Sequence, residues 1–198
     1  MNYNQIYETV EKRFSHTDKQ IKRFNHSKEV VKMALYLNEH LNLNLDIELV
    51  KITAILHDYG KNIPEDEQLK LLEKYLTVDE INHYKSYLPV VHSILGAYLV
   101  KDELQIDDDS IFDAIYYHTT GKKKMSTLTK LIYVSDAVEL SRTYPNVEHY
   151  RRSCYEDLDK GVYEILKGSV ESLKARNLPI ENNTIEALRY YEEYLNEV

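Results

Sequence analysis

The chain has few residues that break helices and lacks the signals that would carry a protein out of the cell or into a membrane. Its 198 residues include five glycines, four prolines and no tryptophan. The one cysteine, Cys154, cannot form a disulfide within the chain, which fits a reducing compartment. No basic start followed by an apolar segment opens the sequence, and no stretch approaches the ~20 apolar residues that cross a bilayer. We therefore expect a cytoplasmic protein without a membrane partner.

The charge balance excludes a second class of partner. The formal net charge is -8 at pH 7, so the field of the whole molecule would repel a polyanion. Polymeric nucleic acid is therefore excluded as a partner. A small phosphorylated ligand is not excluded, because a bound cation and a few basic groups can reverse the potential inside one cleft. The glycine-rich motifs of Rossmann and P-loop nucleotide sites are absent from the sequence.

The long intervals between the glycines and prolines are rich in Leu, Ile, Glu, Lys and Tyr, which indicates an all-α protein. An amphipathic helix is expected from His26 to Leu41. A strongly apolar helix follows, with Asp46 as its N-cap and with His57 and Asp58 at its C-terminal end. Further helices are expected to start at Pro64, Thr77, Pro89, 107–109, Ser126, Pro145 and Thr184. The helix after Pro145 is expected to run unbroken through Leu173, and the whole chain reads as one bundle.

Histidines and aspartates recur on the apolar faces of these helices: His26, His57, Asp58, His92, His118 and Asp136. A single histidine on such a face is more often a hydrogen-bonded core residue than a ligand. Asp136 is different, because it follows Leu128 and Ile132 at helical spacing in a position that the pattern assigns to the core. An unpaired carboxylate there would cost several kcal/mol, so a cation or a dedicated donor must lie close by. One shared metal accounts for all of these residues together.

The mixture of imidazole and carboxylate, without thiolate, favours iron, manganese or catalytic zinc. A divalent cation can lower the pKa of a bound water from 15.7 to about 7, which supplies a nucleophile for hydrolysis. His16, in the segment RFSHT, competes with His26, in RFNHS, for the first ligand position. His26 is preferred because of its helical periodicity and because its distance to His57 leaves room for one helix, a turn and a second helix.

The order His26, His57-Asp58, Asp136 resembles the H…HD…D pattern of HD-domain phosphohydrolases. The flanking segments RFNHS (23–27), ILHDYGK (55–61), VHSILGAYL (91–99), IYYHTTGKKKMS (115–126), IYVSDAVELSR (132–142) and LDKG (158–161) are similar to the YqeK branch of that family. The branch comprises bacterial symmetrical bis(5′-nucleosyl)-tetraphosphatases, and the resemblance covers about residues 20 to 190. It implies an HD-domain helical bundle at 20–198, with 1–19 as an N-terminal helical extension and a metal site between core helices.

The resemblance also implies roles for individual residues. The metal ligands would be His26, His57, Asp58 and Asp136, and the metal would be iron, with manganese as the other candidate. The catalytic residues would be Asp58, Lys61, His118 and Arg142. His92 and His118 could instead hold a second metal, which leaves a mononuclear or a dinuclear centre open. The substrate-binding residues would be Asp58, Tyr59, Gly60, Lys61, His92, His118, Thr119, Asp136, Arg142, Pro179 and Ile180.

The implied reaction is the symmetrical hydrolysis of diadenosine tetraphosphate to two ADP, by attack of metal-bound hydroxide on phosphorus. The expected partner is thus a small dinucleoside polyphosphate or nucleoside diphosphate, and a homodimer is left open. Two alternatives remain from the sequence. One is an HD-type hydrolase of nucleoside triphosphates or monophosphates, and the other is a nucleotide-sensing module with slow turnover.

Overall fold

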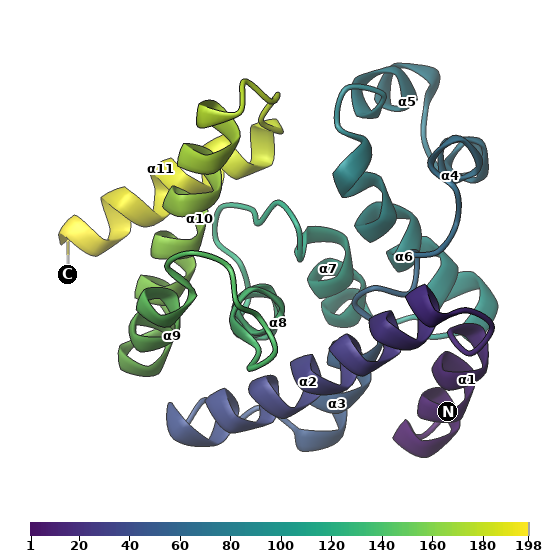
Figure 1. The fold of residues 1–198 in the computed structure, drawn as a ribbon, viewed down its shortest axis with the longest axis horizontal. Helices are drawn as coiled ribbons and strands as arrows, with labels where there is room; N and C mark the ends of the chain where they lie inside the picture. Colours follow the sequence, from purple (N-terminus) through teal and green to yellow (C-terminus); the bar gives the residue numbers. More distant parts are fainter. Residues whose placement is uncertain (198) are drawn as a thin grey trace.

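The computed structural model describes residues 1–197, which form eleven α-helices and no β-strand (Figure 1). The helices are α1 (Tyr3–Arg13), α2 (Asp18–His40), α3 (Ile47–Leu56), α4 (Glu65–Leu72), α5 (Val78–Tyr84), α6 (Leu88–Leu104), α7 (Asp109–Tyr117), α8 (Thr127–Val138), α9 (Val147–Glu156), α10 (Leu158–Ala175) and α11 (Asn182–Glu197). The expected all-α class is therefore confirmed. No helix within the described part is long and apolar enough to cross a membrane.

Four of the expected helix starts, at Asp46, Thr77, Asp108 and Ser126, carry side-chain caps. Asp46 accepts a hydrogen bond from Leu49 N at the start of α3, and Ser126 accepts one from Thr129 N at the start of α8. Thr77 forms a capping box with Glu80 at the start of α5. Each cap satisfies a backbone N–H that the first turn of a helix leaves without an intrahelical partner.

The single long helix expected after Pro145 is wrong. The chain bends at Asp157, which is both the C-cap of α9 and the N-cap of α10 and accepts from Lys160 N. A capping aspartate competes with the helical hydrogen bonds around it, so it starts a new helix here. The expected cap at Thr184 is also wrong, because α11 starts at Asn182 and the side chain of Glu181 accepts from Asn183 N.

Helices α2, α3, α7 and α8 lie at the centre of the molecule and position most of the site. Helix α2 packs against α3 and α8, and α7 packs against α3, α6 and α8 (Figure 1). Helix α3 is apolar along most of its length, since Val50, Ala54, Ile55 and Leu56 are buried. The ends of α3 and α7 therefore lie inside the molecule, where their last residues face α2 and α8. Helix α1 packs on α3, and its residues Ile6 and Val10 belong to the same hydrophobic core.

Candidate metal and phosphate site

Three buried histidines share one hydrogen-bonding arrangement. The Nδ1 atoms of His57, His92 and His118 lie 2.7, 2.9 and 2.7 Å from the backbone carbonyl oxygen three residues earlier. A carbonyl can only accept, so the Nδ1 atoms of His57 and His118 carry the proton and their Nε2 atoms keep a lone pair. His57 and His118 are the C-caps of α3 and α7, where the free carbonyls of the last turn are available. The backbone thus sets the tautomer that a metal ligand needs.

His26, on α2, is oriented by side chains and not by a backbone carbonyl. Its Nδ1 lies 3.1 Å from Glu139 Oε1, and its Nε2 lies 2.9 Å from Asp136 Oδ1. Glu139 is 1% exposed and also accepts from Ser141 N at 2.6 Å and Ser141 Oγ at 2.7 Å. Burial lowers the pKa of His26, but the hydrogen bonds with Asp136 and Glu139 outweigh it, so the pKa is raised. Glu139 therefore fixes the orientation of the His26 ring.

The Nε2 atom of His57 has no hydrogen-bond partner within residues 1–197, although the side chain is completely buried. It faces two carboxylates, with Asp58 Oδ2 at 3.5 Å and Asp136 Oδ1 at 3.9 Å. Burial lowers the pKa of His57, which favours the neutral ring. A buried nitrogen without a partner is costly unless something else satisfies it. A neutral imidazole whose lone pair points at two carboxylates is the donor set that a divalent cation requires.

Asp58 lies between two pairs of histidines. Its Oδ2 is 3.5 Å from His57 Nε2 and 3.9 Å from His26 Nε2, whereas its Oδ1 is 3.2 Å from His92 Nε2 and 3.6 Å from His118 Nε2. The Nε2 atoms of His92 and His118 are 3.3 Å apart. Burial would raise the pKa of Asp58, but its contacts with these histidines hold the pKa well below its usual range. Each oxygen of the ionised carboxylate thus faces its own pair of imidazoles.

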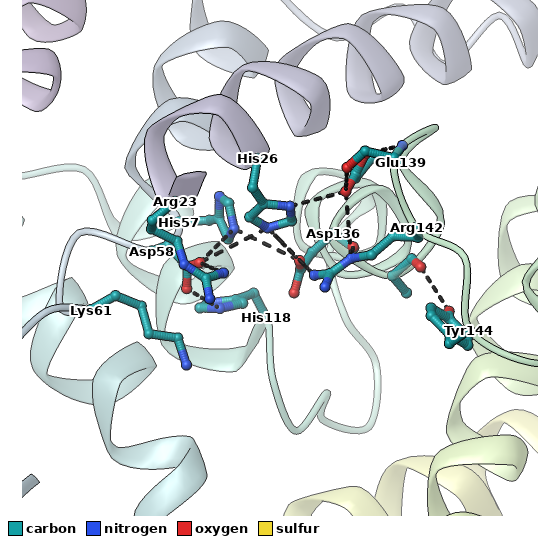
Figure 2. A network of polar contacts seen from close by, with 12 residues as sticks. Arg23, His26, His57, Asp58, Lys61, His118, Asp136, Glu139, Arg142 and Tyr144 are labelled. Carbon is teal, nitrogen blue, oxygen red and sulfur yellow. Dashed lines mark hydrogen bonds and ion pairs between the residues drawn. The ribbon is translucent and has the colours of Figure 1, made fainter. Parts of the chain in front are cut away.

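The potential ligands form two groups that share His57. His26, His57 and Asp136 form one group, and His57, Asp58 and His118 form the other, each with its ligand atoms within 4.8 Å of one another. Asp136 is also ionised, because hydrogen bonding to His26 and the charge of Arg142 overcome the effect of burial and lower its pKa. The structure therefore brings together His26, His57, Asp58 and Asp136, the four ligands that the sequence predicts, and places His118 beside them (Figure 2).

Three cationic side chains surround the cluster (Figure 2). Arg23 Nη1 lies 2.6 Å from Asp58 Oδ2, and Arg142 Nη2 lies 2.6 Å from Asp136 Oδ1. Lys61 Nζ is 3.0 Å from His92 Nδ1 and has no ion-pair partner among the described side chains. Burial lowers the pKa of Lys61, while the charge of Asp58 opposes the shift. Each ligand carboxylate thus has an arginine beside it, and the lysine amine remains available to an anion.

A cavity of about 1070 Å³ opens onto the cluster from the side of α2. Its walls come from the first turns of α2, the segment after α3, the start of α6 and the segment after α8, and the lining residues are Lys19, Lys22, Arg23, His26, Lys61, Asn62, Ile63, Pro64, Gln68, Leu88, Pro89, His92, Glu139, Ser141, Arg142, Thr143 and Tyr144. This volume is at the upper end of the range for small-molecule sites.

The remaining predicted substrate residues lie at the edge of this arrangement. Tyr59 turns away from the cluster, since its hydroxyl donates to Glu103 at 2.8 Å and Arg13 covers its ring. Gly60 contacts the backbone of α6. Thr119 follows His118, and its buried hydroxyl has no hydrogen-bond partner among the residues that the structure describes. Pro179 and Ile180 are absent from the cavity lining. The roles of these residues stay predictions.

Sequence reasoning missed two residues, Arg23 and Glu139. Arg23 lies three residues before His26 on the same face of α2, and Glu139 lies three residues after Asp136. Helical spacing from the predicted ligands was a signal that could have found both. Glu181 lies outside the cluster. Its side chain is buried and contacts His83 Nε2 at 3.5 Å, so its carboxylate is held at the start of α11.

Comparisons with known proteins identify the family of the chain. The HD domain family model matches residues 23–141. The chain is 33% identical over 172 residues to the symmetrical bis(5′-nucleosyl)-tetraphosphatase of Staphylococcus aureus, covering 86% of this chain and 87% of that protein. It is 32% identical over 162 residues to the Bacillus subtilis protein of the same name, covering 82% and 85%.

A solved structure has the same fold. The crystal structure of a predicted HD superfamily hydrolase involved in NAD metabolism, from Clostridium acetobutylicum, superimposes with a TM-score of 0.85. The two sequences are 27% identical, and the superposition covers 98% of each chain.

Proposed function

This chain belongs to the HD-domain family, in the branch of symmetrical bis(5′-nucleosyl)-tetraphosphatases, and we propose that it hydrolyses diadenosine tetraphosphate to two molecules of ADP. The observation that carries the proposal is the buried Nε2 atom of His57, which has no partner and faces Asp58 and Asp136. HD-domain hydrolases use divalent metals, and this donor set fits one.

His26, His57, Asp58 and Asp136 would hold the metal. The mixture of two imidazoles and two carboxylates supports iron, with manganese as the other candidate. A bound divalent cation lowers the pKa of a water, and so supplies a nucleophile at neutral pH. The position of Asp58 between two histidine pairs supports a second metal at His92 and His118, with Asp58 as the shared ligand.

The basic side chains would bind the polyphosphate. Lys61 is a partly buried amine without a carboxylate partner among the described side chains, so it is placed to donate to phosphate oxygens. Arg142 and Arg23 neutralise Asp136 and Asp58, and their remaining N–H groups are available to the substrate. Water adds to one of the two central phosphorus atoms, and the bond from that phosphorus to the central bridging oxygen breaks. One ADP receives the oxygen of water, and the other keeps the bridging oxygen.

The test is product analysis in ¹⁸O-labelled water. Metal-loaded protein should convert diadenosine tetraphosphate to ADP alone, with one ¹⁸O in half of the ADP molecules. ATP and AMP as primary products would overturn symmetrical cleavage. A parallel panel of nucleoside triphosphates and monophosphates identifies any other substrate, and an Asp136→Asn variant, which lacks a predicted ligand, controls for contaminating hydrolases.

A further inference from the structure

Helix α2 presents a row of basic residues that leads outward from the metal site. Lys19, Lys22, Arg23 and His26 all line the cavity, and their spacing of three, four and seven residues places them on one face of the helix. At 1.5 Å of rise per residue, Lys22 lies about 6 Å and Lys19 about 10 Å from His26 along the helix axis. The row therefore extends beyond the cluster of ligands by the length of two helical turns.

The two lysines of this row, Lys19 and Lys22, are not engaged in ion pairs with the described side chains. Arg23 pairs with Asp58, and Arg142 pairs with Asp136, so two of the five cations in the lining are already matched to carboxylates. Lys19 and Lys22 form no ion pair with any side chain that the structure describes, and both are exposed to the cavity mouth. The one acid among the described lining side chains, Glu139, is occupied by His26 and Ser141. The outer cavity is thus cationic in a chain whose net charge is -8.

A dinucleoside tetraphosphate consists of two nucleoside diphosphate units, so a site that binds it needs a subsite for each unit. Cleavage at the centre of a dinucleoside tetraphosphate leaves two phosphates on each product, and Lys61 with the cluster can serve only the phosphates closest to it. We propose that Lys19 and Lys22 bind the phosphates of the outer half, the nucleoside diphosphate unit that extends along α2 away from His26. This subsite rests on the proposed function, since it assigns one half of that substrate to α2.

The variant that tests it is the double substitution Lys19→Gln and Lys22→Gln. The matched control is Lys28→Gln with Lys32→Gln, which removes the same charge from the same helix. Position 28 is nine residues, or two and a half turns, from position 19, so Lys28 lies on the opposite face, and neither Lys28 nor Lys32 belongs to the cavity lining. The probes are ADP and a diadenosine tetraphosphate analogue whose central bridging oxygen is replaced by methylene. Calorimetry measures the affinity of each metal-loaded protein for both.

The lysines are exposed, so each ion pair with phosphate should contribute only a few-fold to affinity. We expect the double variant to bind the analogue about tenfold more weakly than wild type, with ADP affinity within threefold and the control within twofold for both probes. Analogue affinity within twofold of wild type would overturn the subsite. So would an equal loss for ADP, or a wild type that binds the analogue no more tightly than ADP. The products of diadenosine tetraphosphate hydrolysis test the proposed function separately, because the binding measurement involves no turnover.

Discussion

Gly60 packs directly against the backbone of Gly96, and this contact brings the end of α3 up to the first half of α6. A Cβ atom on Gly60 would overlap the carbonyl oxygen of His92 and lie 2.8 Å from Gly96 N. Both groups belong to a helix backbone, which cannot move as a flexible side chain can. The two histidines on either side of Asp58, His57 and His92, owe their proximity to the absence of a side chain at Gly60.

Gly60→Ala should therefore destabilise the protein by about 1–3 kcal/mol, the usual cost of forcing an extra methyl group into a packed interior. Urea denaturation of the metal-free protein measures the change. The control is Gly168→Ala, where the added Cβ would meet the end of the Tyr150 side chain, which can rotate away. Equal stabilities for the two alanine variants would mean that α3 and α6 can separate without cost.

Metal binding should stabilise the fold through His57. A ligand at 100 times its dissociation constant adds about 2.7 kcal/mol, so manganese or ferrous iron should raise the melting temperature of wild type. His57→Gln should remove this increase, because the Nε2 lone pair is lost. His149→Gln, which changes an exposed histidine, should retain it. If wild type melts at the same temperature with and without either metal, the proposed centre does not bind them.

Glu139 should control metal affinity without touching the metal. Removal of the carboxylate that orients a ligating histidine typically costs 10–100-fold in affinity, and Glu139 accepts from His26 Nδ1. We expect a loss of this size in Glu139→Ala, measured by calorimetry with Mn²⁺. Glu139→Gln keeps one acceptor oxygen and should lose less. Glu186→Gln, on the exposed face of α11, is the control and should bind Mn²⁺ like wild type.

The residues of the candidate cluster could be found from the sequence because their spacing and their flanking residues are local features. His57 and Asp58 stand at the end of an apolar helix, and Asp136 interrupts an apolar stripe, so both signals lie within a few turns of chain. The caps at Asp46, Thr77 and Ser126 are local for the same reason. Confirmed features of the fold are thus those that neighbouring residues determine.

The contacts that the sequence did not reveal join residues that are far apart. Glu139 meets His26 across 113 positions, and Arg23 meets Asp58 across 35. Their partners depend on how α2 packs against α3 and α8, which no local pattern specifies. The helix break at Asp157 was not predicted for another reason. An apolar face continues from Cys154 to Leu158, and hydrophobic periodicity alone does not reveal a capping residue within it.

His92 should make the metal-free protein sensitive to mild acid. Burial lowers the pKa of His92 to about 4, below the 6.5 of an exposed histidine. Between these values the unfolded chain binds a proton that the folded chain excludes, so stability is complete above pH 6.5 and falls as the pH decreases toward 4. The loss integrates to about 3 kcal/mol. Urea denaturation at pH 7 and pH 5 should show a smaller pH effect in His92→Gln than in wild type, and an equal effect would contradict the assignment.

Substitution of Arg142 should lower catalytic activity without removing the metal. Its guanidinium donates to the backbone oxygen of Asp136 at 3.0 Å through Nε and pairs with the carboxylate through Nη2. A guanidinium is never a metal ligand, so Arg142→Ala should keep its metal, whereas Asp136→Asn should not. If the free N–H groups of Arg142 hold phosphate oxygens more strongly in the transition state than in the bound substrate, their loss should lower kcat as well as kcat/KM.

The expected decrease in kcat for Arg142→Ala is about 10²–10³-fold, the usual cost of one well-placed electrostatic donor. Arg152→Ala, on the exposed face of α9, changes the net charge equally and should leave both kinetic constants unchanged. Metal content and melting temperature, measured on the same preparations, exclude unfolding as the cause. An Arg142→Ala variant within twofold of wild type in kcat would show that this arginine only neutralises Asp136. Stabilisation of the transition-state charge would then depend on Lys61, the partly buried cation near the cluster that has no carboxylate partner among the described side chains.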